Sequence, residues 1–125
     1  MAFATRALGP AYDVLAPDGS EVRLLASAAK GSMAHFTLQP GQTSLAVCHR
    51  TVEELWFVLS GAGEMWRSRA GKEQVTSLLK GISLAIPVGT SFQFRCTGKE
   101  PLQAVAVTMP PWPGEDEAFS VAGKW

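Results

Sequence analysis

The chain has 125 residues, of which 46% are hydrophobic and 18% charged. This composition excludes global disorder, and the length is that of one domain that can bury a core without disulfides. Eleven basic residues balance eleven acidic ones, so no excess positive charge favours nucleic acid or anionic membrane. No apolar run approaches the ~18 residues of a membrane span, and the N-terminus lacks the apolar stretch of a secretory signal. We therefore expect a cytoplasmic protein with reduced cysteines that binds neither nucleic acid nor membrane.

Turn signals divide the chain into segments of strand length. Twelve glycines and eight prolines are spread along the sequence rather than clustered. For residues 21–30 (EVRLLASAAK) a short helix is the alternative, and we favour a strand followed by a loop. The regular spacing of the turns predicts an all-β sandwich or barrel. The predicted strands, rich in β-branched and aromatic residues, are 33–38, 44–49, 53–60, 64–69, 74–79, 82–87, 91–96 and 102–109.

The last sixteen residues differ in character from the predicted barrel core at about 20–109. Three prolines in the tail, residues 110–125, exclude a central strand there. Its large apolar side chains, Trp112, Phe119 and Trp125, indicate that the tail lies over the barrel or over a partner subunit. The acidic run at 115–117 is expected to be a solvated turn. The sequence thus predicts one domain over 1–125, with an irregular aromatic tail.

One of the two histidines is placed for chemistry. His49 ends a predicted strand in which it shares a face with Val47, because side chains alternate with period two. Glu54 lies in the next predicted strand, on the same face as Trp56. If these strands are neighbours, the imidazole and the carboxyl group can meet. Such a pair can bind a metal, transfer a proton or form a buried hydrogen bond, and all three interpretations stay open.

Two segments resemble the two sequence motifs of the cupin family. The segment GQTSLAVCHRTVEELWFVLSG resembles the first motif, and GISLAIPVGTSFQFRC resembles the second. The positions that fall at the motif spacings are Gly41, His49, Glu54, Gly61, Gly81, Pro87 and Gly89. The resemblance implies a double-stranded β-helix, the cupin jelly-roll barrel, whose interior hosts isomerases, epimerases, lyases, dioxygenases and decarboxylases. Fold alone does not choose among these activities.

The chain departs from the family pattern at the metal positions. Cupin metal sites typically use three histidines and one glutamate, and Val47 and Phe92 stand at two of the histidine positions here. Only His49 and Glu54 remain, and one imidazole with one carboxylate holds a divalent ion loosely. We therefore expect no cofactor, with a loosely bound divalent metal as the alternative. The further candidate ligands are His35 and Cys96, for which a structural histidine and a buried thiol are the alternatives.

The function implied is the handling of a small organic ligand of unknown identity. We expect His49 and Glu54 to perform metal-independent acid–base chemistry, similar to that of the isomerase and epimerase branch of cupins. The alternatives are a non-catalytic ligand-binding or sensing module and a structural dimeric domain with a vestigial site. The resemblance also implies a homodimer. The residues expected to line the pocket are Val47, Trp56, Trp66, Phe92 and Phe94, although core filling is the alternative for the tryptophans.

Overall fold

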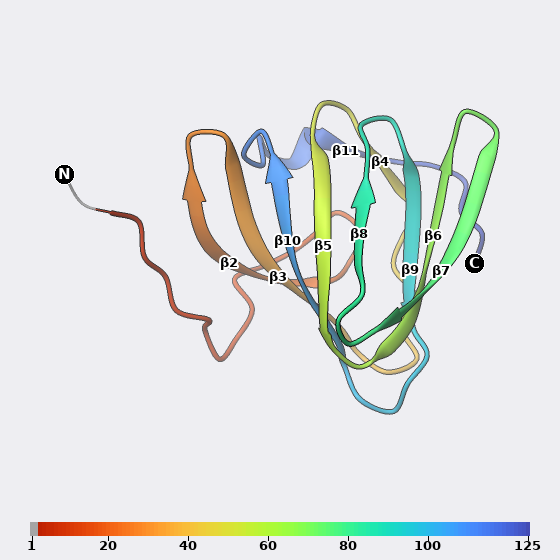
Figure 1. Ribbon diagram of the computed structural model, residues 1–125, viewed down its shortest axis with the longest axis horizontal. Coiled ribbons are helices and arrows are strands. Elements are labelled where there is room, and N and C mark those ends of the chain that lie inside the picture. Colours follow the sequence, from red (N-terminus) through yellow and green to blue (C-terminus); the bar gives the residue numbers. More distant parts are fainter. Residues whose placement is uncertain (1–2) are drawn as a thin grey trace.

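Two antiparallel β-sheets face one another in the computed structural model, which describes residues 3–125 (Figure 1). The first sheet has the order β1-β2-β3-β10-β5-β8 and the second has the order β11-β4-β9-β6-β7. This arrangement is a double-stranded β-helix, as the sequence predicted. The strands are β1 Val14–Leu15, β2 Glu21–Ala28, β3 Gly31–Leu38, β4 Val47–His49, β5 Glu53–Ser60, β6 Ala62–Arg69, β7 Lys72–Leu79, β8 Ser83–Ile86, β9 Ser91–Cys96, β10 Leu102–Met109 and β11 Ala118–Ser120.

The strand predictions hold closely, and the stretch at 21–28 is a strand rather than a helix. β5, β9 and β10 have the predicted bounds. β4 is shorter than the predicted 44–49, because Ser44 leaves the regular ladder. The Ser44 amide donates to the Phe94 carbonyl at 2.8 Å, and its hydroxyl accepts from the Phe94 amide at 3.0 Å. No helix among residues 3–125 is long and apolar enough to cross a membrane.

The core lies between the sheets and follows the alternation along each strand. In β5, Trp56 and Val58 are buried, whereas Leu55 and Phe57 are exposed on the opposite face. The Trp56 ring stacks on Phe36 with a centroid distance of 5.5 Å and meets the edge of Phe94 at 4.9 Å. Burying large rings in this way supplies much of the hydrophobic stabilisation of such a sandwich.

Gly61 shows why the β5–β6 turn needs glycine. Its φ angle is +82°, a conformation that side chains disfavour. A Cβ atom built at this position would lie 2.4 Å from the carbonyl oxygen of Pro101, which is backbone and cannot move aside. Gly61 therefore allows both the tight β5–β6 turn and its close approach to the β9–β10 loop.

The tail is more ordered than predicted. Residues 118–120 form β11 and pair with β4, so the tail adds an edge strand to the second sheet. The prediction of a solvated acidic turn was wrong for Glu117, at the end of the 3₁₀ helix η1 (Glu115–Glu117). Its carboxylate is buried because it accepts hydrogen bonds from the backbone amides of Thr51 and Val52, at 2.6 and 3.1 Å.

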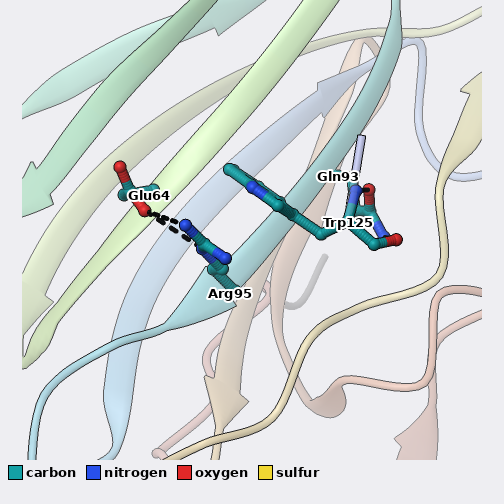
Figure 2. A network of polar contacts seen from close by, with 4 residues as sticks. All are labelled: Glu64, Gln93, Arg95 and Trp125. Carbon is teal, nitrogen blue, oxygen red and sulfur yellow. Dashed lines mark hydrogen bonds and ion pairs between the residues drawn. The ribbon is translucent and has the colours of Figure 1, made fainter. Parts of the chain in front are cut away.

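The last residues lie on the outer face of the second sheet (Figure 2). Gln93 donates to the Trp125 carbonyl and accepts from the amides of Lys124 and Trp125, at 2.9–3.2 Å. The Arg95 guanidinium lies 4.2 Å from the centre of the Trp125 ring and donates to Glu64 at 2.7 Å. Figure 2 shows Arg95 between the carboxylate and the indole. The tail thus covers the barrel, one of the two placements that the sequence allowed.

Candidate functional site

A cavity of about 680 Å³ opens between the two sheets and under the tail. This volume lies within the range of small-molecule sites in proteins. Its walls are mostly apolar and come from both sheets, the β1–β2 turn and the segment after β10. The lining residues used below are Arg6, Asp18, Phe36, Val47, His49, Glu54, Phe92, Ala106, Thr108, Trp112 and Glu115.

His49 enters the cavity from β4 and is 6% exposed. Its ring meets the edges of Phe92 and Trp112, each at a centroid distance of 5.1 Å. Within residues 3–125, the buried Nδ1 atom has no hydrogen-bond partner. Burial lowers the pKa of the imidazole, and the nearby charge of Glu117 opposes this shift without cancelling it. The ring is therefore neutral at pH 7 and can accept a proton.

Glu54 enters the same cavity from β5 and is 4% exposed. Its Oε2 atom accepts a hydrogen bond from the Trp56 indole. Burial raises the pKa of Glu54 to about 7; the indole hydrogen bond opposes this shift and the charge of Asp18 adds to it. Near neutral pH the group is therefore present in both protonation states, so it can donate or accept a proton.

The two groups reach the cavity from opposite sheets. β4 pairs with β9 and β11, whereas β5 pairs with β8 and β10. The premise that their strands are neighbours was therefore wrong, because the chain crosses between the sheets at residues 50–52. In the described part of the chain, no hydrogen bond joins His49 to Glu54. A ligand between the sheets can contact both groups.

The predicted pocket residues divide into three groups. Val47 and Phe92 line the cavity. Trp56 and Phe94 lie in the hydrophobic core beside it. Trp66 lies on the face of β6 opposite Met65, where its indole donates to Glu73 at 3.1 Å. Because consecutive strand residues face opposite ways, the β6 register decides this outcome, and the sequence alone left that register open.

Residues 34–108 match the cupin domain family. The chain belongs to the cupin family. Over 82 residues, 66% of the chain, it is 33% identical to the xanthan biosynthesis protein XanB of Xanthomonas campestris, and it covers only 17% of that protein. It is 30% identical over 114 residues to an uncharacterized protein of Methanocaldococcus jannaschii, covering 84% of this chain and 88% of the other.

A solved cupin fold of similar size supports the same architecture. An uncharacterized protein with a double-stranded β-helix domain from Klebsiella pneumoniae superposes with a TM-score of 0.69 at 18% identity. The match covers 96% of this chain and 92% of the other. It establishes the fold of this cupin over nearly its whole length and says nothing of its chemistry.

The donor set of this cupin does not fit the family's metal site. Val47 and Phe92 are paired residues on β4 and β9, and both place apolar atoms in the cavity wall. The other two candidate ligands lie elsewhere: His35 is buried on the face of β3 opposite Phe36, and the Cys96 thiol lies in the core. Within residues 3–125, no three His, Cys, Asp or Glu side chains are placed to hold a metal ion together.

Sequence reasoning missed two residues of the site and placed a third only in outline. Asp18 lies in the β1–β2 turn, and neither motif marks it as a cavity residue. Glu117 was assigned to solvent. The ring of Trp112 was expected over the barrel, but its contact with His49 was not. All three reach the site through tertiary contacts between distant segments, and no local pattern in the sequence signals such contacts.

Proposed function

We propose that this cupin binds a small hydroxylated molecule of about monosaccharide size between its sheets, and that His49 and Glu54 move a proton on it. The observation that carries the proposal is a buried imidazole and a buried carboxyl group facing one cavity from opposite sheets. The likeness to a protein named for xanthan biosynthesis supports a carbohydrate ligand. The chemistry proposed is of the isomerase or epimerase type.

The protonation states support this chemistry at neutral pH. The pKa of His49 is lowered by burial, so its ring is free to act as a base, while Glu54, with a pKa of about 7, can act as the acid. The imidazole removes a proton from the carbon beside a carbonyl group, and the C–H electron pair forms a carbon–carbon double bond. The carbonyl oxygen takes the proton of Glu54. The imidazolium then returns a proton to an enediol carbon while Glu54 takes a proton from an enediol hydroxyl, which restores a carbonyl group and gives the isomer or epimer.

The walls of the cavity suit such a proton transfer. Phe92 and Trp112 flank the imidazole and restrict the approach of water to it. In a site with little water, charge interactions between the ligand and the two side chains are stronger than in bulk solvent. Thr108, at the end of β10, adds a hydroxyl group that can hydrogen-bond to a polar ligand.

Proton exchange in heavy water tests the proposal. The protein is incubated in D₂O with D-glucose, D-mannose and D-fructose, and NMR follows deuterium at the carbon beside the carbonyl. We expect incorporation with at least one sugar, lost in His49→Ala and strongly reduced in Glu54→Gln. Glu53→Gln is the matched control, because Glu53 is the exposed neighbour on the outer face of β5. Equal incorporation in His49→Ala would remove the imidazole from the mechanism, and binding without incorporation would favour a sensing module.

A further inference from the structure

Asp18 is a third buried polar group of the cavity, and neither motif of the family contains it. It lies in the turn between β1 and β2 and is 7% exposed. Its Oδ1 atom accepts hydrogen bonds from the amide and the hydroxyl of Ser20, at 2.9 and 2.6 Å. Within residues 3–125, its Oδ2 atom accepts none. One carboxylate oxygen therefore positions the side chain, and the other is free.

Glu54 has the same arrangement of one occupied and one free oxygen. Oε2 is occupied by the Trp56 indole, and in the described chain Oε1 accepts no hydrogen bond. The two carboxyl groups are close enough for the charge of Asp18 to disfavour ionisation of Glu54. Burying two carboxyl groups in an apolar cavity is costly unless a cation or hydrogen-bond donors compensate them. Within the protein, only half of the oxygens on these two groups are satisfied.

The remaining charges of the cavity do not supply the missing cation. Glu115, on η1, adds a third carboxyl group to the lining. Arg6 is the one Lys or Arg side chain in the lining; it lies on the exposed N-terminal segment, and its guanidinium makes no ion pair within the described residues. His49 is neutral near pH 7, and Glu117, whose charge acts on it, is held by Thr51 and Val52. The cavity is therefore acidic.

We propose that Asp18 and Glu54 together bind the ammonium group of the ligand, so that the cavity selects an amine-bearing molecule of about monosaccharide size. This inference rests on the proposed function in one respect, which is that the ligand occupies the same cavity. The ammonium contact uses the carboxylate form of Glu54 and the proton transfer uses its protonated form, and both forms are present near pH 7. An ammonium group offers three N–H donors, enough for both free carboxylate oxygens, and its single positive charge offsets one of the two negative charges that the ionised groups carry. A neutral hydroxyl group can hydrogen-bond to the same oxygens but leaves their charge uncompensated.

Matched pairs of probes test the charge separately from the sugar ring. D-Glucosamine is compared with D-glucose, and cyclohexylamine with cyclohexanol, by ligand-observed NMR near pH 7. We expect each amine to bind about tenfold more tightly than its neutral partner, or about 1.4 kcal/mol. Cyclohexylamine keeps its charge from pH 5.5 to 8, so its binding should tighten over that range as Glu54, whose pKa is about 7, ionises. His49, Glu115, Glu117 and Arg6 also face this region and are present in every variant compared.

Asp18→Asn and Glu54→Gln should each abolish the preference for the amine. Both are expected to fold, because an amide oxygen can still accept from Ser20 or from Trp56. Asp116→Asn and Glu53→Gln are the matched controls, since both residues are exposed outside the cavity; these variants should keep the preference.

The outcomes separate this inference from the proposed function. Tighter binding of both amines, lost in the two cavity variants, supports both. A preference for cyclohexylamine with no sugar bound supports the ammonium site and contradicts the carbohydrate ligand. Equal binding of glucose and glucosamine, unchanged in Asp18→Asn, overturns the ammonium site and leaves the proposed function standing. If no probe binds the folded protein, both proposals are wrong.

Discussion

Glu54 is held in the protein by one hydrogen bond and is otherwise surrounded by the cavity and the core. Taking a carboxylate out of water disfavours its charged form, which is why its pKa is about 7 rather than about 4.5. The buried carboxylate of Glu54 therefore destabilises the fold when it is ionised. The raised pKa also suits Glu54 to acid–base chemistry, because the group exchanges a proton near neutral pH.

Replacing Glu54 with glutamine should flatten the pH dependence of stability. A carboxyl group whose pKa is raised on folding contributes stability below about pH 4.5 and loses it as the pH rises to about 7. The shift corresponds to a loss on the order of 3 kcal/mol in wild type. Urea unfolding at pH 5 and pH 8 should show a smaller loss in Glu54→Gln than in Glu53→Gln. Equal losses of unfolding free energy between pH 5 and pH 8 in the two variants would contradict the claim that ionised Glu54 destabilises the fold.

The paired positions Val47 and Phe92 explain why this cupin lacks the family's donor set. Both are buried, and their Cα atoms are partners in the β4–β9 ladder. Val47 precedes His49 by two residues on the same strand. Side chains at these positions face the cavity together with the imidazole. The difference from the family thus lies in two side chains and not in the backbone that presents them.

Histidines at these two positions should therefore create a metal site. The variant Val47→His with Phe92→His places three imidazoles and Glu54 around one cavity, a donor set that suits divalent transition metals. We expect about one Zn²⁺ or Mn²⁺ per chain after dialysis, measured by elemental analysis, and much less in wild type. One metal ion per chain in wild type would show that its own side chains bind the metal. That result would contradict our interpretation that Val47 and Phe92 remove the metal site.

At the scale of elements, Glu117 joins the tail to the barrel. Burial alone would raise the pKa of this carboxyl group, yet hydrogen bonds from Thr51 and Val52 outweigh it and hold the pKa below its ordinary value. The Arg50 amide donates to the Glu117 carbonyl at 2.9 Å, and the Arg50 guanidinium lies over the Phe119 ring. Trp112 lies five residues before Glu117 in the tail. The hydrogen bonds of Glu117 therefore also help to keep the Trp112 indole beside His49.

Glu117→Ala should loosen the tail and weaken the fold. Buried amides of Thr51 and Val52 would lose a charged acceptor, which costs about 2–4 kcal/mol in the free energy of unfolding. This contribution is present above about pH 4.5 and is lost at lower pH as the carboxylate is protonated. Urea unfolding of Glu117→Ala and of the exposed control Asp116→Ala measures the difference. Equal midpoints would show that the anchor is not needed.

The strands were predictable because their information is local. Turn residues and runs of β-branched and aromatic side chains predicted the bounds of β5, β9 and β10 to the residue. The sheet in which each strand lies is a long-range property, so the condition that β4 and β5 be neighbours could not be decided from the sequence, and it is not met. The same limit explains Asp18 and Glu117, whose partners in space belong to other segments. His49 and Glu54 were found from the alternation along their predicted strands and from the family's spacing.

At the scale of the molecule, the outer face of the first sheet is notably apolar. Leu55 and Phe57 on β5 are 50% and 45% exposed, and β5 lies between β10 and β8 (Figure 1). Soluble monomers rarely leave such apolar groups clustered in water. The side chains of this face are therefore suited to pairing with a second copy of the chain, which is the homodimer that the family resemblance implied.

We expect the protein to be a dimer with this face as its interface. Light scattering should give about twice the chain mass of 13.3 kDa at micromolar concentration. Phe57→Glu places a charge at the centre of the face and should give a folded monomer, whereas Glu53→Gln, on the rim of the same face, should remain a dimer. A wild-type monomer, or a dimer that survives Phe57→Glu, would contradict this interface.

The most direct test of the central claim is a titration of isotope-labelled protein with D-glucosamine, followed by backbone and imidazole NMR shifts. We predict saturable shifts at His49, Glu54, Ala106 and Trp112, which surround the cavity on both sheets and the tail. Shifts confined to the outer faces, for example at Phe57 or Arg95, or no shifts in the folded protein, would contradict a ligand site between the sheets.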